Sequence, residues 1–216
     1  MRTLLIADDH PLYREAMKNT LLNEYSSLHI IESVNVKNTL ELLDGASVSL
    51  LLLDLYMPDS TDLHGFLRIQ KEYPDLPIVV VSAVDDILLI SKVMRFGARG
   101  FIPKTSKVED IVDAIDTIFK GQIWLPKEIS KQTALLDKEF TELVDKVAEL
   151  TPAQYNVLCC MRGGLLNKQI GYQLNIAEAT VKAHVTATFK KLGINNRTQA
   201  VMIASKLNLE MPPLKA

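Results

Sequence analysis

Residues 3–120 alternate between short apolar runs and longer segments in which apolar residues recur every three to four positions. The short runs are typical of buried strands and cover residues 3–7, 29–33, 49–53, 78–81 and 100–102. The longer segments predict helices over residues 11–24, 37–43, 63–72, 86–95 and 108–119. Strands that alternate with helices form parallel sheets covered by helices on both faces. We therefore expect a doubly wound α/β fold around a five-stranded parallel sheet.

Local signals mark the last of these helices. Ser106 and Glu109 have the spacing of a capping box before the helix, and Gly121 is a stop signal after it. In a doubly wound sheet, ligands bind at the carboxyl ends of the strands, where the strand order reverses. Residues that directly follow a predicted strand are therefore the first candidates for function.

The end of the chain differs from this pattern in both charge and periodicity. Residues 1–150 contain 16 Lys and Arg against 24 Asp and Glu, a net charge of −8, whereas residues 151–216 contain eight against two, a net charge of +6. Four short helices are predicted between residues 151 and 206, the first with a capping sequence at Thr151 and a stop at Gly163. A short basic helix after a tight turn indicates a helix-turn-helix, and its positive charge indicates binding to nucleic acid. A solvated basic face without a partner is the alternative.

A helical stripe precedes this basic region. It consists of Leu136, Phe140, Leu143, Val147 and Leu150, and it is too short for a coiled coil. Such a linker helix either docks on a neighbouring domain or forms a dimer contact. We expect a first domain over residues 1–121, a linker over 122–148 and an all-helical domain over 149–216.

Composition excludes several classes of protein. Hydrophobic residues make up 48% and charged residues 23%, which is ordinary for a globular protein. The apolar runs are too short to span a bilayer, and the N-terminus does not resemble a signal peptide. Cys159 and Cys160 are adjacent on a predicted helix and point apart, so we expect neither a disulfide nor a zinc site. These features predict a cytoplasmic protein that does not bind membranes.

Charged and polar residues follow four of the five predicted strands. Asp8 and Asp9 follow the first strand, Asp54 the third and Ser82 the fourth, and Lys104 lies just beyond the fifth. Each residue alone has an ordinary explanation as a helix cap, a loop residue or a solvated charge. Together they predict three carboxylates that repel one another unless a cation is present, and Mg²⁺ prefers such oxygen ligands. This set suits an aspartate that accepts a phosphoryl group.

At these residues the chain resembles a known family. Residues 4–10 (LLIADDH), 52–58 (LLDLYMP), 80–83 (VVSA) and 97–104 (GARGFIPK) are similar to the motifs of two-component receiver domains. Residues 150–201 resemble the DNA-binding domain of the NarL/FixJ (LuxR-type) subfamily, through the segments 150–152, 167–170, 180–185, 191–193 and 196–198. The resemblance covers nearly the whole chain.

The resemblance implies a phosphorylation-controlled transcription regulator that is not an enzyme beyond its own dephosphorylation. Asp54 would be the phosphoacceptor, and Asp9 and Asp54 would bind Mg²⁺ directly, with Asp8 acting through water and the Tyr56 carbonyl completing the site. Lys104 would contact the phosphoryl oxygens, Ser82 would follow the phosphoryl group, and Phe101 would change rotamer with it. The implied partners are a cognate sensor histidine kinase or a small phosphodonor, promoter DNA, a second copy of the chain and RNA polymerase.

The resemblance also assigns DNA contacts. Val181, Val185 and Phe189 are predicted to face the core, which leaves other faces of the helix over 178–191 for DNA. The positions of Lys182, Ala183 and Thr186 would contact bases, and Thr180 lies beside them. Phosphate contacts are expected from Lys168, Lys190, Lys191 and Arg197. His184 has either a packing role or a phosphate contact.

Three positions depart from the family pattern. Asp62 stands where a glycine is common after the phosphorylation site, and Ala177 stands where a capping Ser or Thr is usual. Gly171 replaces a helix former. The last two changes are each expected to cost about 1 kcal/mol of stability.

Two other functions are compatible with the same architecture or with a similar aspartate site. A regulator of this architecture could work without phosphorylation, although the complete set of pocket residues argues against it. A phosphatase with an aspartyl-phosphate intermediate usually has a second carboxylate two residues after its nucleophile, and this position is Tyr56.

Overall fold

The computed structural model of the protein describes residues 2–60, 63–136 and 138–212. Asp62 lies outside the described residues. The chain divides into two compact units, residues 1–135 and residues 136–216. Each unit is described by itself below.

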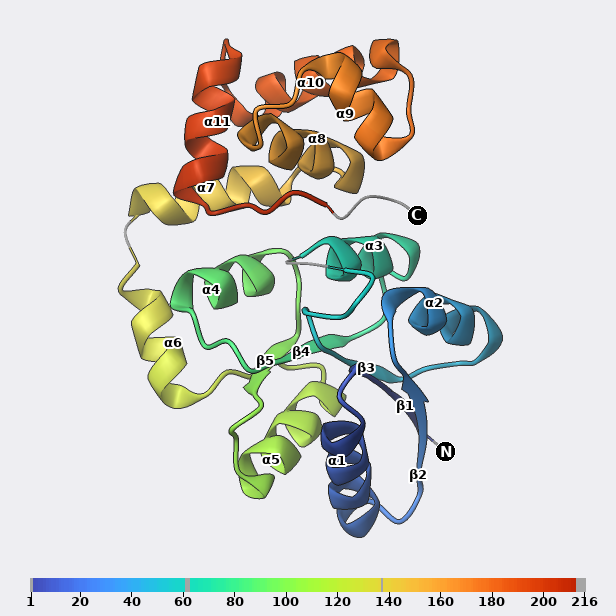
Figure 1. The fold of residues 1–216 in the computed structure, drawn as a ribbon. Helices are drawn as coiled ribbons and strands as arrows, with labels where there is room; N and C mark the ends of the chain where they lie inside the picture. The colour runs from blue at the N-terminus through green and yellow to red at the C-terminus, as the bar shows by residue number, and fades with distance from the viewer. Residues whose placement is uncertain (1, 61–62, 137, 213–216) are drawn as a thin grey trace. The chain divides into compact units, whose positions relative to one another are not determined.

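The first unit is a parallel sheet between two layers of helices (Figure 1). The strands are β1 (Arg2–Ala7), β2 (Leu28–Ser33), β3 (Leu50–Leu53), β4 (Ile78–Ser82) and β5 (Gly100–Pro103), in the order β2-β1-β3-β4-β5. The helices are α1 (Pro11–Glu24), α2 (Val36–Gly45), α3 (His64–Glu72), α4 (Ile87–Arg95) and α5 (Val108–Phe119). Helices α1 and α5 cover one face of the sheet and α2, α3 and α4 the other. The predicted doubly wound five-stranded sheet is confirmed.

The continuous apolar strands follow from this layering, because a strand covered on both faces needs apolar side chains in both directions. All residues of β3 and β4 are buried. The strand order reverses at β1, which pairs with β2 on one side and with β3 on the other. The carboxyl ends of β1 and β3 therefore form the switch point of the sheet.

The ends of α5 agree only in part with the sequence signals. Gly121 follows the helix with φ +78°, as the predicted stop requires. The capping box at Ser106 is wrong, because the helix begins at Val108 and its N-cap position is Lys107. A lysine ammonium cannot accept a hydrogen bond from the backbone, so this helix starts without the predicted cap.

The segment between the β/α layers and the basic helices holds two helices where the sequence predicted one. Helix α6 (Lys127–Ala134) belongs to the first unit and packs beside α4. Helix α7 (Lys138–Ala148) belongs to the second unit and packs against α10 (Glu178–Leu192). The Nζ atom of Lys206 lies 2.9 Å from Oε1 of Glu139 at the start of α7. Of the predicted stripe, Phe140, Val147 and Leu150 are buried in the helical unit, whereas Leu136 and Leu143 are half-buried.

The second unit continues with α8 (Pro152–Arg162), α9 (Asn167–Leu174), α10 and α11 (Arg197–Lys206). The capping box at Thr151 is confirmed, since its hydroxyl accepts from the Gln154 amide and the Gln154 side chain accepts from the Thr151 amide. Helices α9 and α10 are separated by a short turn that begins at Asn175, with φ +55°. These two helices form the predicted helix-turn-helix.

Two sequence expectations for α9 and α10 need correction. Val185 and Phe189 are only half-buried, whereas Thr188 is fully buried, so the core-facing side of α10 is rotated from the predicted stripe. Gly171 is not merely a poor helix former. A Cβ atom on Gly171 would lie 2.8 Å from the carbonyl oxygen of Ile176, so only glycine leaves room for the turn to fold back onto α9.

Candidate metal centre and nucleic-acid interface

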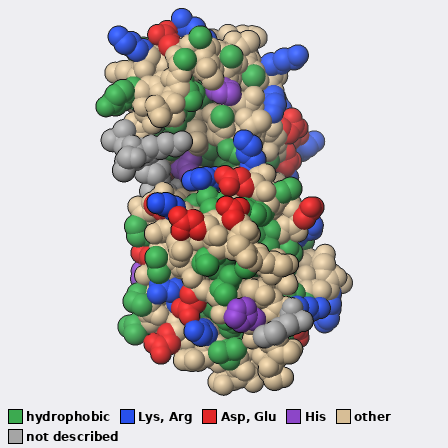
Figure 2. Space-filling model, turned by 90° about the vertical axis from the view of Figure 1, so that its right-hand side faces the viewer, with side chains coloured by type: hydrophobic (Ala, Val, Ile, Leu, Met, Phe, Trp, Pro, Cys, Tyr) green, Lys and Arg blue, Asp and Glu red, His purple; other side chains and the backbone are tan. Residues whose placement is uncertain are grey.

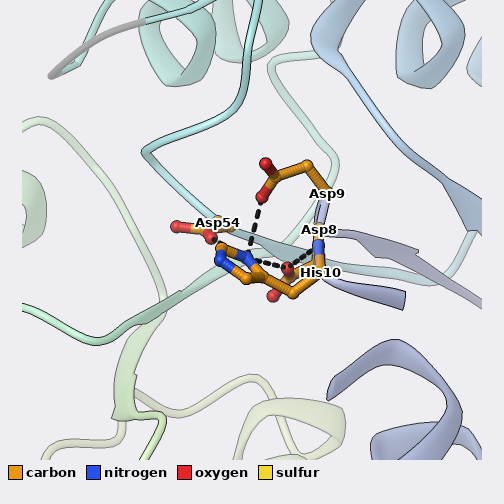
Figure 3. A group of neighbouring side chains, drawn as sticks. All are labelled: Asp8, Asp9, His10 and Asp54. Carbon is orange, nitrogen blue, oxygen red and sulfur yellow. Dashed lines mark hydrogen bonds and ion pairs between the residues drawn. The ribbon is translucent and has the colours of Figure 1, made fainter. Parts of the chain in front are cut away.

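The carboxylates of Asp8, Asp9 and Asp54 meet at the switch point of the sheet (Figure 3). Asp8 and Asp9 directly follow β1, and Asp54 directly follows β3. The amide of Asp54 donates to the Ala7 carbonyl at 2.8 Å, which continues the pairing of β1 with β3 and brings the two loops together. Asp8 and Asp54 are almost fully buried, at 2% and 4% exposure. Two buried carboxylates side by side require a counter-charge.

Lys104 supplies positive charge to this cluster. Its Nζ atom lies 2.7 Å from Oδ2 of Asp54 and 2.7 Å from Oδ2 of Asp8. Burial raises the pKa of the Asp54 carboxyl, and the hydrogen bond from Lys104 only partly opposes this change. Burial by itself would lower the pKa of Lys104, but its hydrogen bonds to Asp54 and Asp8 raise that pKa overall. The lysine therefore stays charged between the two carboxylates.

His10 is part of the cluster and was missed by the sequence analysis. Its Nδ1 atom lies 2.8 Å from Oδ1 of Asp9 and 3.1 Å from Oδ1 of Asp8. The backbone amide of His10 also donates to Oδ1 of Asp8 at 2.8 Å. His10 follows two aspartates and precedes Pro11, and it is the N-cap residue of α1. This position in the sequence is the signal that could have identified it.

One oxygen or nitrogen atom from each of Asp8, Asp9, His10 and Asp54 lies within 4.8 Å of the others. The three carboxylates are hard oxygen ligands, which fit Mg²⁺ better than a soft metal. The donor set is therefore compatible with the ion that the sequence predicted, and the fold places all three predicted carboxylates at one site.

The remaining predicted pocket residues lie after β3, at the end of β4 and on β5. The amide of Tyr56 donates to Oδ1 of Asp54 at 3.1 Å. Ser82 is buried at the end of β4, where its hydroxyl accepts from the Val84 amide at 3.1 Å. The amide of Lys104 donates to the Ser82 carbonyl at 2.8 Å, and Phe101 is fully buried on β5. The structure thus bonds Tyr56 and Lys104 directly to Asp54, and it links Ser82 to the site through the backbone of Lys104.

Helix α1 contributes two further residues that the sequence analysis did not single out. The ring of Tyr13 lies 4.8 Å from Nζ of Lys104, close enough for a cation–π contact. Nη1 of Arg14 donates to the backbone carbonyl of Asp8 at 2.7 Å, and Nε of Arg14 lies 3.4 Å from Oε2 of Glu32 on β2. These contacts hold the loop after β1 and the lysine opposite it.

The second unit presents the predicted DNA-contacting residues. Side chains that are exposed on α9 and α10 belong to Lys168, Thr180, Lys182, Ala183, Thr186, Lys190 and Lys191. Figure 2 shows lysine and arginine side chains at several places on the outer surface of this unit. The exposed side of α10 is the side that a major groove can accept.

Several of these side chains also have partners within the protein. Nζ of Lys182 lies 2.9 Å from Oε1 of Glu178, one turn earlier on α10. Nζ of Lys191 donates to the Glu149 carbonyl at 2.6 Å, and the half-buried Arg197 donates to the Leu165 carbonyl. A carbonyl is a neutral acceptor, so neither of these two bonds is an ion pair with an acidic side chain.

Comparison with known proteins covers both units. The family described as the response regulator receiver domain matches residues 4–116, and the family of bacterial regulatory proteins described as luxR matches residues 148–204. The chain belongs to the NarL/FixJ type of DNA-binding response regulators. This response regulator therefore joins a receiver to a DNA-binding domain and regulates transcription.

Relatives resemble this response regulator over nearly its whole length. It is 38% identical over 214 residues to the Glycerol metabolism activator of Pseudomonas putida. The match covers 96% of this chain and 97% of the relative. It is 28% identical over 201 residues to the nitrate/nitrite response regulator protein NarL of Escherichia coli (strain K12), and the match covers 93% of each chain.

Solved structures share the fold. The RcsB response regulator of Salmonella typhimurium has a TM-score of 0.60 and 21% identity, and the match covers 95% of this chain and 100% of that chain. A LuxR family DNA-binding response regulator from Silicibacter pomeroyi has a TM-score of 0.53 and 28% identity, with 60% of this chain and 99% of that chain covered. Within residues 2–60, 63–136 and 138–212, no helix is long and apolar enough to span a membrane.

Proposed function

We propose that Asp54 accepts a phosphoryl group from a cognate sensor histidine kinase or from a small phosphodonor. The observation that carries this proposal is the position of the Asp54 carboxylate, buried at the switch point with Lys104 2.7 Å from one of its oxygens. In the transfer, the bond from phosphorus to the donor breaks and a bond from phosphorus to a carboxylate oxygen of Asp54 forms. Such transfers depend mostly on positioning and charge neutralisation.

The residues around Asp54 have separate roles in this proposal. Asp9 and Asp54 would hold Mg²⁺ directly, Asp8 through water, and the Tyr56 carbonyl would complete the protein ligands. When bound, the ion neutralises negative charge on the carboxylates and the incoming phosphoryl oxygens. Lys104 contacts those oxygens from the other side, and the Ser82 hydroxyl donates to one of them. Phe101 changes rotamer as Ser82 follows the phosphoryl group.

Loss of the phosphoryl group is the one further reaction proposed for this site. A water molecule attacks the phosphorus, the bond to the Asp54 oxygen breaks, and inorganic phosphate leaves. Tyr56 and Val84, at 39% and 40% exposure, lie two residues after Asp54 and Ser82. Neither side chain carries a carboxylate or amide that could orient the water.

The output of the proposed switch is promoter binding by a dimer. Lys182, Ala183 and Thr186 would contact bases with Thr180 beside them, and Lys168, Lys190, Lys191 and Arg197 would contact phosphates. Two RcsB dimers are described as bound to DNA in one of the solved structures, which supports a dimer on two half-sites. The protein would act in the cytoplasm, together with RNA polymerase.

The test is phosphorylation of the full chain by acetyl phosphate, read on phosphate-affinity gels. Wild type is expected to be labelled with Mg²⁺ present and not after chelation, because the carboxylates need a cation before an anion can approach. Asp54→Asn is expected to lose labelling, and Asp75→Asn, an exposed aspartate before β4, is the matched control. Unchanged labelling of Asp54→Asn would show that another residue is the acceptor. A wild type that is never labelled would favour a phosphorylation-independent regulator.

A further inference from the structure

The chain leaves the receiver along the outer edge of the sheet, through the exit segment, residues 122–135. Trp124 in this segment pairs with Gly100 of β5 in a parallel bridge. Its amide donates to the Arg99 carbonyl at 3.0 Å, and its carbonyl accepts from the Phe101 amide at 3.3 Å. A Cβ atom on Gly100 would lie 3.1 Å from the Trp124 carbonyl oxygen, so the glycine permits this close approach. The exit segment thus extends the sheet beyond β5 on the side opposite β4.

The side chain of Trp124 ties the exit segment to the receiver core. The indole is 9% exposed and belongs to the apolar core that includes Ile102 of β5 and Ile115 and Ile118 of α5. Its Nε1 atom donates to Oδ2 of Asp113 on α5 at 2.8 Å. Trp124 is therefore held from its backbone by β5 and from its side chain by α5.

The rest of the exit segment contacts a second switch-related element. Helix α6 packs beside α4, with Ile129 buried (Figure 1). Helix α4 is the first helix after Ser82, and β5 is the strand that leads to Lys104. The exit segment therefore contacts α4, which follows Ser82, and β5, which leads to Lys104. Ser82 and Lys104 are the two residues proposed to contact the phosphoryl oxygens.

The connection from Asp54 to Trp124 is short. Lys104 bonds Asp54 through its Nζ atom at 2.7 Å and the Ser82 carbonyl through its amide at 2.8 Å. Ser82 pairs with Pro103, and Val80 pairs with Phe101, in the ladder between β4 and β5. The Phe101 amide is in turn bonded to Trp124. Strand β5 therefore bonds Trp124 at its first two residues and leads to Lys104 at its carboxyl end.

We propose that Trp124 is a positioning residue of the switch, which transmits phosphorylation of Asp54 from β5 to the exit segment and so to the DNA-binding unit. This inference rests on the proposed function of Asp54. Proximity alone does not establish coupling, which requires an element whose state both sites change. The proposal identifies that element as β5 together with the exit segment, held by the Trp124–Asp113 hydrogen bond.

The first test uses the fact that Trp124 is the sole tryptophan of the chain. Emission of the full-length protein is recorded as beryllium fluoride, a phosphoryl mimic, is added with Mg²⁺. Wild type is expected to show a saturable change in emission, and Asp54→Asn is expected to show none. If acetyl phosphate labels Asp54 but neither reagent changes the emission, the coupling is wrong and the proposed function stands. If acetyl phosphate does not label Asp54 and beryllium fluoride leaves the emission unchanged, the proposed function and the coupling are both wrong.

The second test separates transmission from a merely structural role of the indole. Asp113→Ala removes the acceptor of the indole N–H, and Asp110→Ala removes the same charge from an exposed position one turn earlier on α5. Each full-length variant is assayed for labelling by acetyl phosphate. Each is also assayed for affinity, before and after labelling, toward a duplex enriched from a random library by the phosphorylated wild type.

Asp113→Ala is expected to be labelled like wild type and to bind the duplex equally before labelling, yet to lose most of the gain in affinity on phosphorylation. That gain is expected to be about fivefold or more in wild type and in Asp110→Ala, as for typical allosteric coupling. An undiminished gain in Asp113→Ala would overturn the proposal. An equal loss of the gain in affinity in Asp110→Ala would also overturn the proposal, because the loss would then result from the changed charge of α5 and not from the Trp124–Asp113 hydrogen bond.

Discussion

At the scale of single residues, Gly171 shows how close packing can override a local preference. Glycine inside a helix costs about 1 kcal/mol relative to alanine, so Gly171→Ala should stabilise α9 by propensity alone. The carbonyl of Ile176 leaves no room for the added methyl group, and the Gly171 carbonyl accepts from the Ile176 amide at 2.9 Å. The turn of the helix-turn-helix depends on both contacts.

Gly171→Ala is therefore expected to destabilise the second unit by about 1–3 kcal/mol, the usual range for overpacking. Gly45→Ala is the control, because Gly45 lies within α2 and a Cβ there would meet nothing within 4 Å. The control should be neutral or stabilising by up to about 1 kcal/mol. Urea unfolding followed by circular dichroism measures both. A gain in stability for Gly171→Ala would show that the turn can move away from α9.

At the scale of elements, α10 carries two kinds of basic side chain. Lys182 lies near the start of the helix and pairs with Glu178, but an exposed pair of this kind contributes little and is easily exchanged for a DNA contact. Lys190 lies in the last turn, two residues before the helix ends at Leu192. A helix that enters the groove with its first turns places Lys182 near base edges and Lys190 near the backbone.

Lys182→Ala is expected to cost about 1–3 kcal/mol of binding free energy at the preferred sequence and to relax sequence preference. Lys190→Ala is expected to weaken all sequences about equally. Lys206→Ala, on α11, removes the same charge from a side chain paired with Glu139 and is the control. Affinities are measured against single-base variants of a duplex enriched from a random library. If Lys182→Ala and Lys190→Ala have the same profile across these variants, the division into base and phosphate contacts is wrong.

At the scale of the whole molecule, charge is divided along the chain. Residues 151–216 carry a net charge of +6, and residues 1–150 a net charge of −8. The acidic part would repel DNA, so attraction must come from the basic side chains of the helical unit. The bonds of Lys191 and Arg197 go to neutral carbonyls and not to acidic side chains.

All four proposed phosphate contacts should therefore release counterions. A dimer would make eight such contacts, so the logarithm of the binding constant should fall with the logarithm of salt concentration with a slope of about −7. Titration of a fluorescent duplex at several salt concentrations measures this slope. A slope of about −3.6 or shallower would show that at least half of the eight proposed phosphate contacts are not made.

The sequence alone determined the fold of the first unit, the order of the two units and the acidic site. Buried parallel strands need continuous apolar runs, and carboxyl ends of neighbouring strands meet at one edge, so Asp8, Asp9 and Asp54 could be placed together from their positions in the chain. The helix-turn-helix was equally readable, because capping residues and glycine stops act over three or four residues.

Only the tertiary structure decided features that depend on contacts between distant segments. Tyr13 and Arg14 became part of the site because α1 packs near Lys104 and Glu32, far away in the sequence. Gly171 changed from a defect to a requirement once the Ile176 carbonyl was beside it. The bridge from Trp124 to Gly100 spans 24 residues, and no local pattern marks it because a single bridging residue has no periodicity.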